Sequence, residues 1–250
     1  DVYGTFVPGF ESVLGHLPRN TIGVYSYSKY FGCTGWRLGV IAVAQDNIFD
    51  EKIKAHPEEI QQLLEKRYKP MTPQPRELKF VDRIVADSRD VALNHTAGLS
   101  LPQQVMMTLF GLVEMMDTEK AYQNACIAIC VKRFENLIEG MGIESNPGKY
   151  FDHYYGIIDL EFWLRKYVGE DVVQWVKANI HPLDIPFRLA EDHGIVLLNG
   201  SGFAAPNWSA RVSFANLHDE AYSQIGRAVR SIARGYVQAY QASKGETITA

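Results

Sequence analysis

The stretch from Tyr25 to Gly39 constrains the fold most, because a single lysine stands between flanking hydroxyls and a run of interleaved glycines follows it. Residues 21–28 are rich in β-forming side chains, and residues 36–43 form a second apolar run without a helical period, so the pattern predicts two strands. Lys29 is therefore expected where the first strand ends. A lysine in such a turn can form a Schiff base with a carbonyl compound.

The residues around this lysine suit a phosphate group. Arg37 can bind two phosphate oxygens at once through its planar guanidinium, and the hydroxyls of Ser26 and Ser28 provide neutral donors beside it. A lone Ser-x-Ser-Lys would be no more than a solvated surface charge. The longer pattern predicts a site for an aldehyde cofactor that carries a phosphate. Three glycines are expected to permit the positive φ angles and the close backbone approach of the turn: Gly32, Gly35 and Gly39.

The complete pattern Ser-x-Ser-Lys-x-x-Gly-x-x-Gly-Trp-Arg-x-Gly resembles the lysine signature of the class I and II aminotransferases, which are fold type I pyridoxal-phosphate enzymes. The resemblance implies pyridoxal 5'-phosphate as the cofactor. It also implies that Lys29 is the catalytic lysine that binds the cofactor covalently. By the same comparison Ser26, Ser28 and Arg37 are cofactor-binding residues.

Two further segments resemble elements of that family. Tyr3 matches a tyrosine that contacts the hydroxyl of the cofactor ring, and Asp1 then occupies the second acidic position of the same element, so the partner of the pyridine nitrogen would precede residue 1. Arg211, within Ala-Arg-Val-Ser-Phe, matches the arginine that binds the α-carboxylate of the substrate. Because Arg211 lies on an apolar, strand-like run, its guanidinium is expected to have an anionic partner there.

The resemblance extends over the whole chain and implies an α/β fold, the C-terminal part of the aspartate aminotransferase-like fold. Residues 1–117 are expected to be the remainder of the large cofactor-binding domain, with a helical insert at about 47–93, and residues 118–250 the smaller α/β domain. In this family the cofactor lysine lies beyond the middle of the polypeptide, whereas here it is Lys29. The chain is therefore expected to be part of a longer enzyme and to be inactive alone.

Within the family, the chain is most similar to the enzymes that remove the β-carboxylate of aspartate. Residues 2–10, residues 25–41 and the long segment 47–93 carry this similarity. It implies conversion of L-aspartate into L-alanine and CO2, with aminotransferase side activity, by a homodimer or larger homo-oligomer. An ordinary aspartate or aromatic aminotransferase remains an alternative, as does a catalytically silent fragment with an assembly or regulatory role. The turn at residues 94–97 is expected to be either structural or a contact to the cofactor phosphate of a neighbouring subunit.

Periodicity and breakers predict the remaining elements. In the insert, residues 49–68 are helix-forming, residues 70–75 are a proline-rich break, and residues 76–91 form another helix. Gly194 is expected to cap the helix before it. The other expected elements are helices at 101–116, 118–142, 161–168, 172–180, 182–193 and 219–242, and strands at 154–160, 195–198 and 211–214.

Composition limits the other functions that the chain can have. Hydrophobic residues make up 46% of its 250 residues, enough for one large domain or two smaller ones, and the net charge of −4 is spread over interspersed acids and bases. Nucleic-acid and membrane partners are therefore not expected.

Seven histidines lack zinc-ligand spacing, so no metal site is expected. Cys126 and Cys130 lie one helical turn apart and are interpreted as reduced core residues. Reduced cysteines are expected in a reducing compartment, so a cytoplasmic location is expected.

Overall fold

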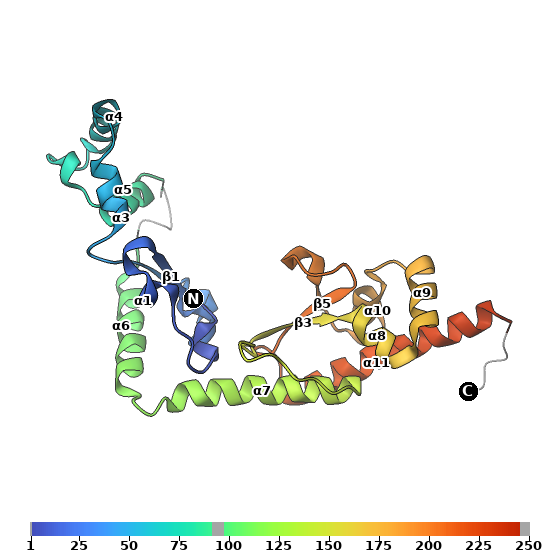
Figure 1. The fold of residues 1–250 in the computed structure, drawn as a ribbon. Coiled ribbons are helices and arrows are strands. Elements are labelled where there is room, and N and C mark those ends of the chain that lie inside the picture. The colour runs from blue at the N-terminus through green and yellow to red at the C-terminus, as the bar shows by residue number, and fades with distance from the viewer. Residues whose placement is uncertain (1, 92–97, 246–250) are drawn as a thin grey trace. The chain divides into compact units, whose positions relative to one another are not determined.

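The computed structural model describes residues 2–91 and 98–245, and the chain divides into two compact units, residues 1–121 and 122–250 (Figure 1). Asp1 and the turn at residues 94–97, both singled out from the sequence, lie outside the described residues. In the part of the chain that is described, no helix combines the length and the apolar character needed to cross a membrane.

The first unit is built around a pair of antiparallel strands. Strands β1 (Ile22–Ser26) and β2 (Gly39–Val43) pair with Ser26 opposite Gly39. The short helix α1 (Val13–His16) precedes β1, and the one-turn helix α2 (Tyr27–Tyr30) follows it directly. Both strands lie within the two stretches that the sequence predicted, so the expected strand, turn and strand are confirmed.

A helical insert follows β2, in three helices rather than two. The predicted helix over residues 49–68 is wrong as a single element, because α3 (Ile48–Lys54) and α4 (Glu58–Tyr68) are separated at Pro57, whose ring removes a backbone donor and restricts the residue before it. Helix α5 (Phe80–Val91) begins later than expected, since Pro75–Glu77 forms a separate 3₁₀ turn. The Asp50 carboxylate accepts a hydrogen bond from the Phe80 backbone N–H at 2.6 Å, which ties α5 to α3.

Helix α6 (Leu101–Met116) closes the first unit and has the bounds predicted from the sequence. Ser100 and Gln103 form a capping box at its N-terminus, so two orphan backbone donors are satisfied. One side of α6 packs on the turn that contains Lys29, as described below. Other apolar side chains of α6 are exposed, and Leu101, Met115 and Met116 are the most exposed of them.

The second unit combines a three-stranded antiparallel sheet with helices. The strand order is β3 (Tyr155–Asp159), β5 (Ser209–Ser213), β4 (Leu198–Asn199), with β5 in the centre. The strand predicted at 195–198 was therefore largely wrong, because β4 shares only Leu198 with that range. The helices of this unit are α7 (Ala121–Met141), α8 (Leu160–Val168), α9 (Glu170–Asn179), α10 (Asp184–His193) and α11 (Asp219–Ser243).

The core of the second unit lies on one face of α11 and one face of β5. Buried side chains recur on α11 at helical spacing, and Val212 and Phe214 are buried on the β5 segment. Gly194 ends α10 in the left-handed conformation, with φ of 65°, as the sequence predicted. Close contact between α7 and α11 requires glycine, because a Cβ atom at Gly226 would lie 2.5 Å from the backbone carbonyl carbon of Gly140. The buried α11 side chains include Tyr222, Ile225, Val229, Ile232 and Tyr236.

Candidate functional site

Lys29 lies in the single helical turn that follows β1, as expected from the sequence. The Ser26 hydroxyl caps this turn by accepting a hydrogen bond from the Ser28 backbone N–H at 3.2 Å. Ser28 is buried and Lys29 is half-buried. Among the described residues, the Lys29 ammonium has no ion-pair or hydrogen-bond partner. The structure therefore brings Ser26, Ser28 and Lys29 together in one turn and leaves the amine available.

Helix α6 fixes the position of this turn. The Phe31 ring stacks on Phe110 of α6, with centroids 4.5 Å apart, and Tyr27 stacks on both rings. The Tyr30 hydroxyl donates a hydrogen bond to the Glu114 carboxylate at 3.1 Å. These contacts hold the residues on either side of the lysine, so its backbone is supported at both ends.

Arg37 occupies the end of the connection between the two strands. Its exposed guanidinium donates one hydrogen bond to the Thr34 carbonyl at 2.9 Å, and its other donors have no partner among the described residues. The strand register places Gly39 opposite Ser26. Arg37, two residues before Gly39, therefore lies near the start of the turn Tyr27–Tyr30 that contains Lys29, called the lysine turn below. The prediction about the glycines was wrong in part: only Gly32 has a positive φ, of 60°, while Arg37 itself is left-handed with φ of 55°.

Tyr3 lies at the start of the chain's first 3₁₀ turn, Gly4–Phe6, and is half-buried. Phe6 from that turn packs edge-on against Tyr30, with ring centroids 6.0 Å apart, so the Tyr3 segment adjoins the lysine turn. Burial raises the pKa of Tyr25 to about 12, which keeps this phenol protonated, although its interaction with Thr5 acts in the opposite direction. Tyr25 packs edge-on against Tyr27, with ring centroids 5.4 Å apart, and Glu114 accepts a hydrogen bond from Tyr30. Neither residue was singled out from the sequence as a site residue.

Arg211 lies in the second unit, in the middle of β5. Because side chains alternate along a strand, Arg211 lies on the face opposite to buried Ala210 and Val212. Within the described ranges Arg211 has no ion pair, so the anionic partner expected from the sequence is not one of the described protein carboxylates. Its guanidinium carbon instead lies 3.7 Å from the ring centroid of Tyr155 and 4.2 Å from that of Phe203. Arg211 and Tyr155 line a cavity of about 240 Å³.

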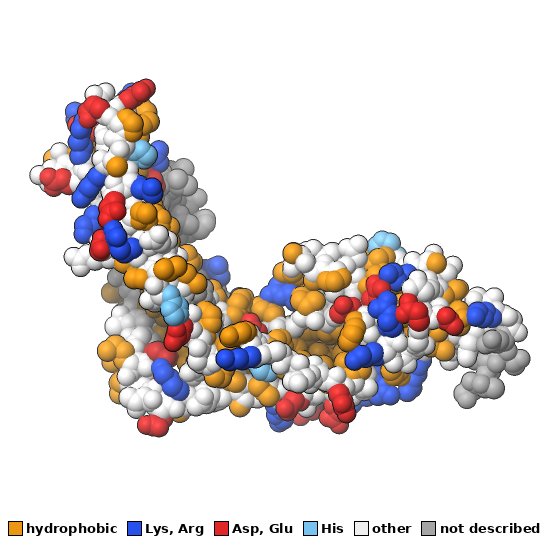
Figure 2. Space-filling view, in the orientation of Figure 1, with side chains coloured by type: hydrophobic (Ala, Val, Ile, Leu, Met, Phe, Trp, Pro, Cys, Tyr) orange, Lys and Arg blue, Asp and Glu red, His pale blue; other side chains and the backbone are white. Residues whose placement is uncertain are grey.

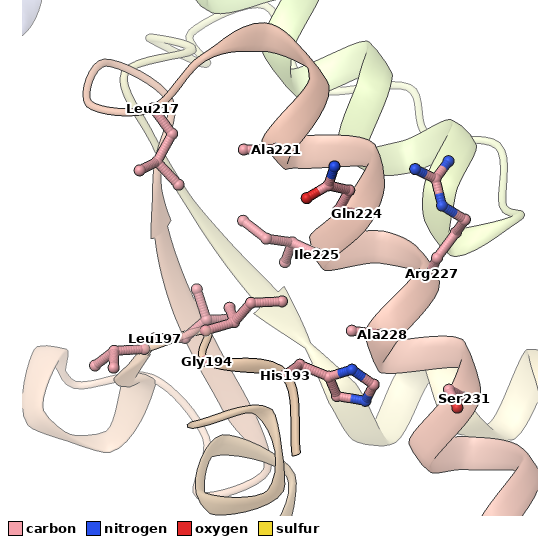
Figure 3. Close-up of a pocket in the computed structure, with 12 residues that line it drawn as sticks. His193, Gly194, Leu197, Leu217, Ala221, Gln224, Ile225, Arg227, Ala228 and Ser231 are labelled. Carbon is pink, nitrogen blue, oxygen red and sulfur yellow. The ribbon is translucent and has the colours of Figure 1, made fainter. Parts of the chain in front are cut away.

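A larger cavity of about 790 Å³ lies beside it, between α11 and the segment that follows α10. Figure 3 shows Leu197, Leu217 and Ile225 around this space, and Gln224 and Arg227 on α11. Its lining is mainly apolar and includes none of the residues that the sequence singled out as a site. It shares four lining residues with the Arg211 cavity, so the two spaces adjoin: Val196, Leu197, Leu217 and Ile225.

Comparisons with known proteins identify relatives of the chain. Residues 1–72, which contain the lysine turn, match the family model "Aminotransferase class I and II". Over 242 residues, 97% of the chain, the sequence is 46% identical to a Pseudomonas protein described as "Bifunctional aspartate aminotransferase and L-aspartate beta-decarboxylase". The chain spans 46% of the length of that relative. Together with the α/β architecture, these matches place the chain in the class I and II aminotransferase family.

Proposed function

We propose that the protein is a pyridoxal 5'-phosphate enzyme that acts on L-aspartate, releases the β-carboxylate as CO2 and forms L-alanine, with aminotransferase activity as a side reaction. The observation that carries this proposal is the capped turn after β1, where the half-buried Lys29 amine has no protein partner among the described residues. The Pseudomonas relative, whose name includes both activities, supports the choice of substrate.

The residues of the lysine turn fit this cofactor by the chemistry of their donor groups. An aldehyde requires a primary amine that is not held in an ion pair, which suits Lys29. A phosphate requires several donors. The Ser26 hydroxyl accepts a hydrogen bond from the Ser28 backbone N–H, but its own O–H remains a donor. Arg37 uses only one of its N–H groups in the hydrogen bond to the Thr34 carbonyl. Tyr3 and Ser28 are the other residues that we assign to cofactor binding. When bound, pyridoxal phosphate supplies an electron sink for negative charge that develops beside the substrate nitrogen.

We assign the proton transfer to Lys29 and the α-carboxylate to Arg211. An amine held by a turn that α6 supports at both ends can take a proton from the substrate α-carbon and return it at a defined place. The Arg211 guanidinium is a cation with planar, fork-like donors and has no carboxylate partner in the described parts of the chain. It can therefore bind a carboxylate with two parallel hydrogen bonds.

The remaining assignments concern organisation. We propose that the first unit belongs to the large cofactor-binding domain and the second is the small domain, in a cytoplasmic homodimer or larger homo-oligomer. The insert is the candidate for oligomer contacts, because its helices leave apolar side chains exposed beside charged ones. These exposed residues are Ile60 and Leu63 on α4, and Val81 and Val85 on α5.

Incubation of the intact protein with L-aspartate alone tests the proposed reaction. Continuous formation of alanine and CO2 over many turnovers is expected, because β-decarboxylation returns the enzyme to its starting state without a second substrate. An ordinary aminotransferase would form one equivalent of oxaloacetate per site and stop until a keto acid was added. A stoichiometric burst without CO2 would therefore replace our proposal with the aminotransferase alternative. Absence of both products would favour a silent chain.

A further inference from the structure

Among the described residues, aromatic rings and not acids contact the guanidinium of Arg211. Its central carbon lies 3.7 Å from the ring centroid of Tyr155 and 4.2 Å from that of Phe203. At such distances a ring lies against a face of the planar group, because an edge-on ring would keep its centroid farther away. The N–H donors point outward in the plane of the guanidinium, so stacking leaves them free for a ligand.

The two rings come from different elements, and each position is set by the backbone. Tyr155 lies on β3 and shares a sheet face with Arg211, because Arg211 pairs with Ile157 and the side chain two residues away points the same way. Phe203 ends the 3₁₀ turn Gly200–Phe203, which Asn199 caps by accepting a hydrogen bond from the Ser201 backbone N–H. A Cβ atom at Gly200 would lie 1.9 Å from the Ser209 hydroxyl, so this turn packs directly on β5.

We propose that Tyr155 and Phe203 are positioning residues that fix the plane of the Arg211 guanidinium for bidentate binding of the substrate carboxylate. This inference rests on the proposed function, in which Arg211 binds that carboxylate. An acidic partner would fix the guanidinium equally well but would neutralise its charge and occupy its donors. Aromatic faces also restrict the guanidinium and attract its charge. They leave its charge and its N–H donors available to the ligand.

Binding of maleate, a four-carbon dicarboxylate that does not react, to the intact, cofactor-loaded protein tests this role by calorimetry. Tyr155→Leu and Phe203→Leu should each raise the dissociation constant about three- to tenfold, the effect expected for one cation–π contact. Tyr155→Phe and Phe203→Tyr keep the rings and should stay within about twofold. Phe162→Leu is the matched control, because this exposed ring on α8 stacks with Lys166 at 4.6 Å and not with Arg211.

A double-mutant cycle separates this inference from the proposed function. In an Arg211→Ala background, loss of either ring should no longer weaken maleate binding. If Arg211→Ala weakens binding and the ring variants bind like the parent, the positioning role is refuted and the carboxylate assignment survives. If Arg211→Ala leaves maleate binding unchanged, the carboxylate assignment is refuted, and the positioning role fails with it.

A spectroscopic measurement on the unsubstituted protein covers the case in which a ring variant does not fold. The Arg211 Nε–H proton, assigned by its loss in Arg211→Lys, should resonate upfield of its position in an unstructured peptide, because aromatic faces shield protons that lie over them. Sharp signals and slow exchange with water should accompany the shift. An unshifted, rapidly exchanging signal would show that the rings do not hold the guanidinium, and would overturn the proposal.

Discussion

Two cations stand out at the scale of single residues, because their positions are well supported and their charges are not neutralised by a neighbour. Lys29 and Arg211 contact no carboxylate among the described residues, whereas Arg76 and Arg133 each pair with acids at 2.7 to 2.9 Å. An ordered cation without a protein anion keeps its charge and its N–H donors for a ligand. This supports our proposal that Lys29 binds the cofactor and Arg211 binds the substrate.

Covalent labelling tests the role of Lys29. Borohydride treatment of the intact, cofactor-loaded protein should fix the cofactor on the peptide that contains Lys29, because reduction makes the bond between the amine and the aldehyde permanent. Lys29→Ala should abolish the label and the visible absorbance of the loaded protein. Lys54→Ala, a change at an exposed lysine of α3, should alter neither. A label on a different lysine would refute the assignment.

The lysine turn could be predicted because it is a contiguous motif, while the surroundings of Arg211 could not. Ser26, Ser28 and Lys29 lie within four consecutive residues, so a strand followed by a turn is enough to bring them together. Tyr155 and Phe203 reach Arg211 only through the register of β3 and β5 and the turn after β4. That pairing is non-local, and no spacing in the sequence records it.

At the scale of elements, helix limits were predicted correctly where the helical periodicity meets a capping residue. Helix α6 begins after its capping box and α10 ends at Gly194, so their limits are encoded locally. The pattern over residues 49–68 looked continuous because both halves are polar and helix-forming, yet Pro57 divides it. The strand predicted at 195–198 was wrong for residues 195–197, which line the cavity beside α11, while β4 comprises Leu198–Asn199.

The contact between α7 and α11 should be sensitive to one added carbon atom. Gly226→Ala is expected to lower the free energy of unfolding by about 1 to 3 kcal/mol or more, because the new Cβ would meet backbone atoms of Gly140 and Met141 at 2.5 Å. Chemical denaturation measures the change. Gly202→Ala is the matched control, since its Cβ would have no neighbour within 4 Å. Equal midpoints for the two variants would contradict the packing described here.

The ion pairs of Asp219 at the start of α11 predict a pH dependence of stability. Hydrogen bonds from Lys132 and Arg133 lower the pKa of Asp219 below its ordinary value of 3.8. The folded pKa is thus below the unfolded one, so the stabilisation is present above about pH 4 and is lost as the pH falls through the folded pKa. Asp219→Asn lacks it at every pH.

Thermal unfolding of the parent and Asp219→Asn from pH 7 to pH 2 measures this dependence. The difference in melting temperature should be largest near neutral pH and should shrink as the solution is acidified. Glu220→Gln removes a charge from the same first turn of α11 without removing the two ion pairs, and its difference from the parent should be smaller. A constant gap between the parent and Asp219→Asn at all pH values would show that the pairs do not form.

At the scale of the whole molecule, the first unit exposes large apolar side chains on both of its strands and on α6. Val24 on β1 is 57% exposed and Ile41 on β2 is 46% exposed, in a sheet that has two strands among the described residues. Met115 and Met116 at the end of α6 are 81% and 71% exposed. Figure 2 shows hydrophobic side chains at the surface over α6. Such surfaces favour association with further protein.

The 250-residue chain, prepared by itself, should therefore self-associate as its concentration rises. Sedimentation velocity over a wide concentration range should show an increasing average mass, because each contact removes apolar surface of β1, β2 and α6 from water. Replacing Met115 and Met116 together by glutamine should weaken the association, since both side chains are exposed and neither replacement disturbs a buried contact. Tyr150→Gln, at an equally exposed apolar residue of the second unit, should leave it unchanged. A monomer at all concentrations would show that these surfaces do not drive assembly.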